Sequence, residues 1–251
     1  MPLRVDMLSK NEIKYIQSLT AKKARMAAGC FLAEGPKLVA EALAHCPERL
    51  LKVYALHGWA HAQGPLLASK TELTVIEPHE LAKISQLQAP QQVLALVALP
   101  AADAVTPPNG QWCLVLNDVQ DPGNMGNMLR TADWFGWQHV FCTPGTVDAY
   151  NPKVVQASMG AIFRLGLHYT EANQLLSNYN GPVYGSFMDG APIKSVLPLA
   201  PGALVVGNEG NGIAPELLPF ITQKISIPRL GQGESLNAAT AAGIFMAMLS
   251  A

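Results

Sequence analysis

The feature that most constrains the fold is an alternation of short apolar runs with segments of helical length, which fills the chain from Gln111 onward. The apolar runs, each closed by Gly, Pro, Asn or Asp, are 112–119, 139–145, 182–188, 203–210 and 225–230. Segments of helical length lie at 124–136, 151–166 and 235–251. Strands that alternate with helices are typical of a parallel sheet covered by helices on both faces. The pattern therefore predicts an α/β fold.

The N-terminal part of the chain predicts a second, smaller α/β unit. Helical patterns at 11–29 and 35–46 are followed by strand-like runs at 50–57, 72–77 and 92–99. The stretch 100–110, PAADAVTPPNG, has no hydrophobic period and is rich in Pro, Ala and Asn, which favours a linker. A chain of 251 residues is long enough for two cores. We therefore predict domains at 1–99 and 111–251, joined by 100–110.

Composition narrows the class of protein. Apolar residues make up 49% of the chain and charged residues 14%, which indicates a compact globular protein. The cysteines show neither a Cys-x-x-Cys pair nor a histidine at zinc-ligand spacing, so we expect reduced, buried thiols and no metal at Cys30, Cys46, Cys113 and Cys142. No apolar stretch has the length of a signal peptide or a membrane span. We expect a cytoplasmic protein without a membrane partner.

Charge is unevenly distributed along the chain. The net charge of −1 counts mildly against a nucleic-acid partner, because phosphate binding is driven by clustered Lys and Arg. Up to residue 37, however, three acidic residues stand against seven basic ones, namely Arg4, Lys10, Lys14, Lys22, Lys23, Arg25 and Lys37. Taken alone, this cluster fits a solvated helical face as well as a surface for RNA.

The loops that leave the strands of a parallel sheet are the places to search for chemistry, since ligands bind beyond the carboxyl ends of these strands. In the first such loop, 117–130, Asn124 is a candidate helix cap, and Arg130 would lie about a turn and a half into the helix. The second, 206–213, sets Glu209 among glycines in the order Gly-x-x-Gly-x-Gly. This order matches neither the dinucleotide fingerprint nor a P-loop, which argues against NAD and ATP.

The third unusual loop, 225–241, combines a strand broken by Pro228, a Gly-rich bend and a helix of small residues. Ser235 or Asn237 would cap this helix. Each of the three loops, taken separately, also fits an ordinary turn or helix start.

Taken together and in this order, the three loops resemble the motifs of the SpoU/TrmH family of RNA ribose 2′-O-methyltransferases, within the SPOUT superfamily. The matching residues are Asn124, Gly126 and Arg130 in the first motif, Gly207, Glu209, Gly210 and Gly212 in the second, and Ile227, Pro228, Ser235, Leu236 and Asn237 in the third. Segments 31–39, 89–97 and 157–164 also look like parts of this family, so that the resemblance covers nearly the whole chain.

The resemblance implies a C-terminal parallel-sheet domain threaded as a trefoil knot and a smaller N-terminal α/β domain that binds RNA. It implies S-adenosyl-L-methionine as the cofactor, held around Gly207, Ile227 and Leu236, and a homodimer. The candidate catalytic residues carried over from the motifs are Arg130, Asn124, Glu209, Ser235 and Asn237. The expected substrate is structured RNA, with ribosomal RNA preferred over transfer RNA, and the basic N-terminal segment then becomes a candidate for phosphate contacts.

Some positions depart from the family pattern. Ala238 and Ala239 stand where Val-Ser is frequent, Gln92 where Gly is frequent, and Asn127 where a small residue is common. These departures leave open a knotted RNA-binding or ribosome-assembly protein without catalysis, although the retained polar residues of the motifs favour an enzyme. A nucleotide-dependent oxidoreductase is disfavoured, because no Gly-x-Gly-x-x-Gly turn follows a strand.

Overall fold

The computed structural model describes residues 6–67, 70–101 and 107–250. Arg4 of the basic cluster and residues 102–106 of the predicted linker lie outside the described residues. The chain divides into two compact units, one formed by Met1–Ala101 with Tyr150–Phe163 and the other by Ala102–Ala149 with Arg164–Ala251. The grouping of Tyr150–Phe163 with the N-terminal unit was not expected, and the predicted domain boundaries stay a prediction.

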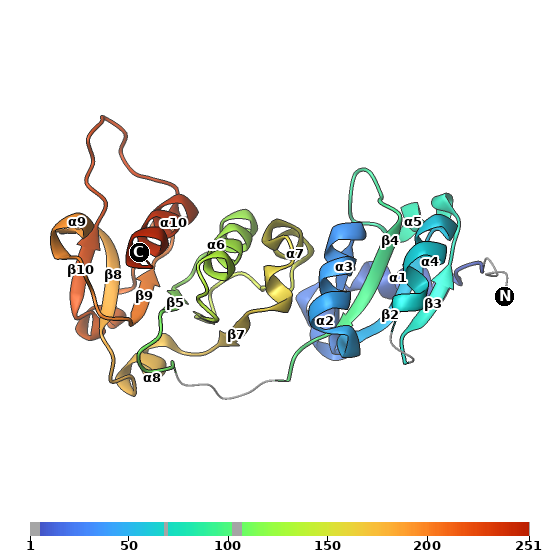
Figure 1. Cartoon of the computed structure of the whole chain (residues 1–251), viewed down its shortest axis with the longest axis horizontal. Coiled ribbons are helices and arrows are strands. Elements are labelled where there is room, and N and C mark those ends of the chain that lie inside the picture. Colours follow the sequence, from blue (N-terminus) through green and yellow to red (C-terminus); the bar gives the residue numbers. More distant parts are fainter. Residues whose placement is uncertain (1–5, 68–69, 102–106, 251) are drawn as a thin grey trace. The chain divides into compact units, whose positions relative to one another are not determined.

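The first unit contains a mixed sheet in the order β1-β4-β2-β3. Three of these strands, β2, β3 and β4, are labelled in Figure 1. Its strands are β1 (Cys30–Glu34), β2 (Leu50–Ala55), β3 (Glu72–Val75) and β4 (Val93–Ala98). β4 is antiparallel to β1 and β2, whereas β2 and β3 are parallel. Its helices are α1 (Lys10–Ser18), α2 (Lys22–Ala28), α3 (Pro36–His45), α4 (His57–Gln63), α5 (Pro78–Ile84) and α7 (Pro152–Ser158), with 3-10 turns η1 (Pro47–Arg49), η2 (Gly64–Leu66) and η3 (Ala161–Phe163). The α/β prediction for this unit is confirmed, although β1 was not predicted as a strand.

Two predicted helices are interrupted in the structure. The expected helix 11–29 is split into α1 and α2, because the Arg25 guanidinium donates hydrogen bonds of 2.8 and 2.7 Å to the carbonyls of Leu19 and Thr20 and holds the break. The expected helix 151–166 ends at Met159 and Gly160, which adopt φ angles of +53° and +98° that do not continue an α-helix.

The basic cluster is smaller than its sequence suggests. Arg25 is buried, with 2% of its surface exposed, and its guanidinium bonds the backbone of its own unit. It is therefore not available to an RNA phosphate. The lysines of the cluster that the structure describes, Lys10, Lys14, Lys22, Lys23 and Lys37, are exposed.

The second unit is built on a parallel sheet in the order β10-β8-β9-β5-β6-β7, as the alternation of strands and helices predicts. Its strands are β5 (Cys113–Leu116), β6 (His139–Cys142), β7 (Gly166–Tyr169), β8 (Val183–Pro192), β9 (Ala203–Val206) and β10 (Gln223–Ser226). Its helices are α6 (Pro122–Trp134), α8 (Ala172–Ser177), α9 (Ile193–Val196) and α10 (Ala238–Leu249), with the 3-10 turn η4 (Pro215–Phe220). β7 was not predicted as a strand, and its first residue, Gly166, is the last residue of the expected helix 151–166.

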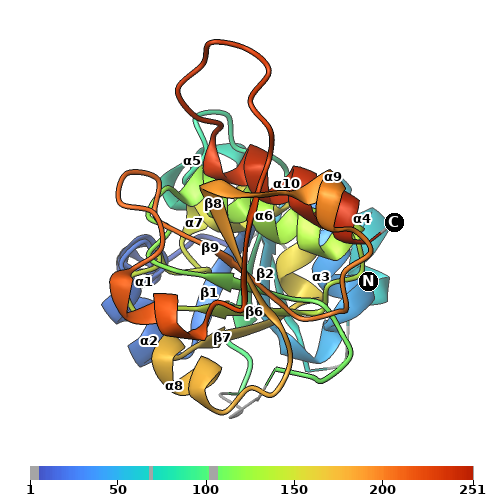
Figure 2. The same ribbon diagram turned by 90° about the vertical axis from the view of Figure 1, so that its left-hand side faces the viewer.

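Helices cover both faces of this sheet. α6 and α10 pack together on one face, and α8 lies on the other (Figure 2). Leu175 and Leu176 of α8 join Leu217 of η4 in a core with alternate residues of β5 and β9, such as Val115 and Val205. All four cysteines are buried, as expected. Among the helices of the described ranges, we find none with the length and apolar character that a membrane span requires.

Candidate active site

α6 begins one loop after the carboxyl end of β5 and brings the first motif into place. Its N-cap is Asp121, whose side chain accepts a hydrogen bond of 2.7 Å from the Asn124 backbone N–H. The prediction that Asn124 caps the helix is therefore wrong. Asn124 lies in the first turn, and Arg130 lies more than two turns into the helix rather than one and a half.

Side chains from the three motifs are connected by hydrogen bonds. The amide nitrogen of Asn124 donates to Oε1 of Glu209 at 2.9 Å, and the amide nitrogen of Asn237 donates to Oδ1 of Asn124 at 2.8 Å. The second Glu209 oxygen accepts a longer bond of 3.5 Å from the Gln120 backbone N–H. Loops more than eighty residues apart in the sequence are thereby held together at one edge of the sheet.

The second motif forms a tight turn directly after β9. A side chain at Gly207 would overlap the backbone of Gly212 and Ile213, so only glycine fits there. Oδ1 of Asn208 accepts the N–H groups of Gly210 and Asn211 at 2.9 and 3.0 Å. The turn therefore has a defined shape that presents Glu209 to Asn124.

Two further asparagine contacts fix this turn against the first motif. The Asn208 amide donates to the carbonyl of Asp118 at 2.8 Å, and Oδ1 of the buried Asn117 accepts the Ala214 N–H at 2.7 Å. Sequence reasoning did not single out Asn117 or Asn208. Their position next to the carboxyl ends of β5 and β9 was the signal that could have found them.

The third motif leads into α10. Asn237 is the N-cap of this helix, and its Oδ1 accepts the N–H groups of Ala239 and Thr240 at 2.9 and 3.2 Å. Of the two caps left open by the sequence, Asn237 is thus the one observed. Ser235 is exposed in the preceding loop, which projects away from the sheet (Figure 2).

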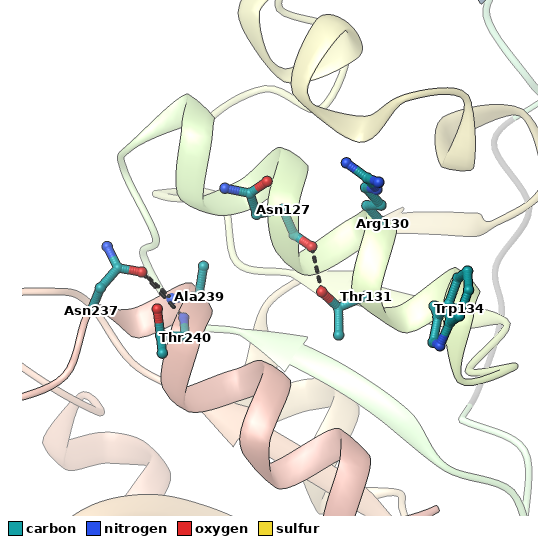
Figure 3. A pocket seen from close by; sticks show the side chains of 7 residues that line it. All are labelled: Asn127, Arg130, Thr131, Trp134, Asn237, Ala239 and Thr240. Carbon is teal, nitrogen blue, oxygen red and sulfur yellow. Dashed lines mark hydrogen bonds between the residues drawn. The ribbon is translucent and has the colours of Figure 1, made fainter.

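Arg130 belongs to a different part of the site. It lines an open pocket of about 420 Å³ between α6 and the start of α10, together with Asn127, Thr131, Trp134, Asn237, Ala239 and Thr240 (Figure 3). Its side chain is exposed and forms no hydrogen bond or ion pair with the part of the chain that the structure describes. A cation in this setting can bind an anion that comes from outside the protein.

The three residues predicted to bind the cofactor follow strands or precede a helix. Gly207 and Ile227 come directly after β9 and β10, and Leu236 directly precedes the cap of α10. Ile227 is partly exposed, and Leu236 has 50% of its surface exposed. Uncharged residues of this kind, beside backbone that approaches closely at Gly207, fit the adenosine part of S-adenosylmethionine, which requires apolar surface and a few backbone hydrogen bonds.

Comparison with known proteins assigns the family. Residues 111–247 match the model of the SpoU rRNA methylase family, and residues 10–95 match an MRM3-like substrate binding domain. The chain belongs to the SpoU rRNA methylase family. The matched range, residues 111–247, contains all of the predicted catalytic and cofactor-binding residues.

Relatives and solved structures agree with the assignment to the SpoU family. A 23S rRNA guanosine 2′-O-methyltransferase from Bacillus subtilis is 29% identical over 97% of each chain. A solved structure of a TrmH-family protein from Porphyromonas gingivalis is 37% identical, with a TM-score of 0.87 over 97% of this chain and 98% of that one. An S-adenosylmethionine-bound rRNA methyltransferase from Sinorhizobium meliloti is 25% identical, with a TM-score of 0.87 over 99% and 98% of the two chains.

Proposed function

We propose that this protein transfers a methyl group from S-adenosylmethionine to a ribose 2′-hydroxyl of structured ribosomal RNA. The observation that carries the proposal is the hydrogen-bonded chain Asn237–Asn124–Glu209, which joins the three motifs. The exposed Arg130 lies on the same helix as Asn124 and beside an open pocket. Membership of the SpoU rRNA methylase family and the named activities of the relatives support this reaction.

The reaction is an in-line attack by the 2′-oxygen on a methyl carbon, which S-adenosylmethionine supplies when it is bound; the methyl carbon–sulfur bond breaks as the new carbon–oxygen bond forms, and S-adenosylhomocysteine would be the leaving group. Gly207, Ile227 and Leu236 hold the cofactor through apolar contact and backbone hydrogen bonds. The protein brings the two reacting atoms to about 3 to 3.5 Å.

Arg130 acts on the RNA. A guanidinium has a pKa above about 12 and does not accept a proton at neutral pH, so Arg130 is not a general base. It clamps a substrate phosphate and stabilises the negative charge that develops on the 2′-oxygen, while the proton leaves through the phosphate or water. The absence of a partner for Arg130 within the described ranges supports this role, because no carboxylate there competes with the phosphate.

The remaining motif residues orient the site. Asn124 and Asn237 hold the start of α6 next to the start of α10, and Glu209 fixes the turn after β9 to Asn124. Ser235, in the exposed loop before α10, binds a phosphate of the RNA. The hydrogen bonds of Asn124, Asn237 and Glu209 support their proposed roles, and the exposure of Ser235 supports its own.

The assembly and location are part of the proposal. The second unit is threaded as a trefoil knot, which is an exception to the rule that chains avoid knots. The enzyme is a homodimer, and the apolar helix α10 contributes to its interface. It acts in the cytoplasm, and the exposed lysines of the N-terminal unit contact RNA phosphates.

The test uses tritiated S-adenosylmethionine with ribosomal RNA and transfer RNA, each isolated from a strain that lacks the gene. We expect label in the ribosomal RNA and none in the transfer RNA. Label in transfer RNA alone would establish the other substrate. Cofactor binding without label in either pool would redirect the test to precursor ribosomal particles, and the absence of cofactor binding would favour a non-catalytic RNA-binding protein.

A further inference from the structure

Trp134 is an aromatic side chain that the fold leaves exposed. It lies at the last position of α6 with 82% of its surface exposed. The other tryptophans are more covered: Trp59 and Trp137 are buried, and Trp112 stacks on Trp137 at a centroid distance of 5.2 Å and an interplanar angle of 8°. An exposed indole of this size loses hydrophobic stabilisation unless a ligand covers it.

The position of Trp134 follows from the period of α6. The buried face of the helix consists of Met125, Gly126, Met128, Leu129 and Ala132. Asn127, Arg130, Thr131 and Trp134 are spaced by three and four residues and form the opposite face, which lines the pocket (Figure 3). Trp134 therefore stands one turn beyond Arg130, where the two Cβ atoms of such a pair are about 5 to 6 Å apart.

The local charges favour an anionic ligand. Asp133, next to Trp134 in the sequence, forms a bidentate ion pair with Arg164, with distances of 2.8 to 3.1 Å. Its negative charge is thereby neutralised, whereas Arg130 remains without a partner among the described residues. The pocket thus presents a free cation next to a free aromatic ring.

We propose that Trp134 is a substrate-binding residue on which a nucleobase of the RNA stacks, close to the phosphate that Arg130 clamps. This inference rests on the proposed function. A nucleotide has a flat base, which can stack on the Trp134 indole, and a phosphate, which can bind the Arg130 guanidinium. These two side chains lie one helical turn apart. The amide of Asn127 and the hydroxyls of Thr131 and Thr240 supply polar partners for the edges of a base.

A second copy of the chain is the competing occupant, because Trp and Arg are also enriched in protein–protein interfaces. The core of such an interface is apolar, however, and a charge buried there without a partner is costly. Here the indole is surrounded by a guanidinium, amides and hydroxyl groups. This chemistry is that of a nucleic-acid site, in which stacking and phosphate contacts occur together.

The experiment compares Trp134→Ala, Trp134→Phe and the control Met188→Ala on an in vitro transcript of large-subunit ribosomal RNA. Met188 is 72% exposed and lies on β8, outside the pocket, so its variant loses comparable apolar surface without touching the site. We expect Trp134→Ala to raise the KM for RNA by about 5- to 150-fold, as the loss of one stacked base implies, with kcat within about twofold. Trp134→Phe restores most of the loss, and Met188→Ala leaves KM unchanged.

A second measurement does not depend on turnover. Binding of the transcript quenches the intrinsic tryptophan fluorescence of the wild-type protein, and Trp134→Phe removes most of this quenching. An unchanged KM in Trp134→Ala together with unchanged quenching in Trp134→Phe would overturn the inference. Dissociation of a dimer by Trp134→Ala, with RNA binding intact, would assign the surface to a second copy instead. Should the wild type methylate no RNA, the proposed function fails, and the quenching alone decides whether Trp134 contacts RNA.

Discussion

The first turn of α6 and its outer face, the one that lines the pocket, differ in whether their polar side chains have hydrogen-bond partners within the protein. Asn124, in the first turn, is bonded to Glu209 and Asn237 from two other loops. Arg130, on the outer face, has no partner among the described residues and lines an open pocket. A bonded amide holds a fixed geometry, whereas an unbonded guanidinium is available to a ligand. One helix thus combines a residue that links the three motifs with a residue for which we propose a role on the substrate.

The largest effect is expected from the outer face. Replacing Arg130 by Ala removes the charge that we propose stabilises the developing alkoxide, and we expect methyl transfer to fall by about 10² to 10³-fold. Arg130→Lys should also lose most activity, because an ammonium does not reproduce a bidentate phosphate contact. Radiolabel transfer measures the rate. Since Arg130 bonds no described residue, the melting temperature should stay unchanged, and a variant with more than a third of the activity would contradict this role.

The next effect concerns the turn that presents Glu209. Gly207→Ala places a methyl group against the backbone of Gly212 and should cost about 1 to 3 kcal/mol of stability, with weakened cofactor binding. Gly210→Ala is the matched control, because its nearest neighbour, Oδ1 of Asn208, lies 3.6 Å from the added carbon. Thermal unfolding and calorimetric titration of S-adenosylmethionine check both variants. Equal effects at the two positions would show that the close approach at Gly207 is not what matters.

A smaller effect is expected from the first turn of α6. Asn124→Ala breaks both links between the motifs, each worth about 0.5 to 1.5 kcal/mol, which corresponds to a fall in melting temperature of about 2 to 4 °C per kcal/mol. Asn127→Ala is its control, since that side chain forms no hydrogen bond with the part of the chain that is described. Scanning calorimetry separates them. An unchanged melting temperature in Asn124→Ala would mean that the links do not hold the loops.

The smallest effect is expected at two cysteines of the parallel sheet, which are buried, in contrast to the exposed Arg130. Burial raises the pKa of the Cys113 and Cys142 thiols to about 12. The thiolate is the reactive form, so a raised pKa leaves these thiols protonated and unreactive at pH 8. We expect no alkylation of either cysteine by iodoacetamide in the native protein, and alkylation of both after denaturation, as read by mass spectrometry. Rapid native labelling of Cys113 would contradict the packing of α8 and η4 on β5.

The parallel sheet could be predicted because its signals are local. Each apolar run is closed by turn residues, and this pattern alone determines where β5, β6, β8, β9 and β10 lie. The break between α1 and α2 could not be predicted in this way, because it depends on the Arg25 side chain reaching the carbonyls of Leu19 and Thr20. Periodicity does not contain such a contact.

For the site as well, some features could be predicted from the sequence and others depend on tertiary contacts. The motif residues Asn124, Glu209 and Asn237 were selected from the sequence, and the structure brings them into contact. The cap of α6 was misplaced although Pro122, a residue favoured at the first helical position, indicated Asp121 before it. The exposure of Trp134 could also have been predicted, because its position lies outside the apolar face of the helix. The pocket beside Arg130, in contrast, depends on how α10 packs on α6.

The central claim is ribose 2′-O chemistry at Arg130, and the most direct test locates the transferred methyl group. Ribosomal RNA labelled by the wild-type protein is digested to nucleosides, which are separated and analysed by mass spectrometry. We predict label in a 2′-O-methylated nucleoside that protects its linkage from alkali, and its absence with Arg130→Ala. Label on a base, or equal 2′-O-methylation by Arg130→Ala, would contradict the account.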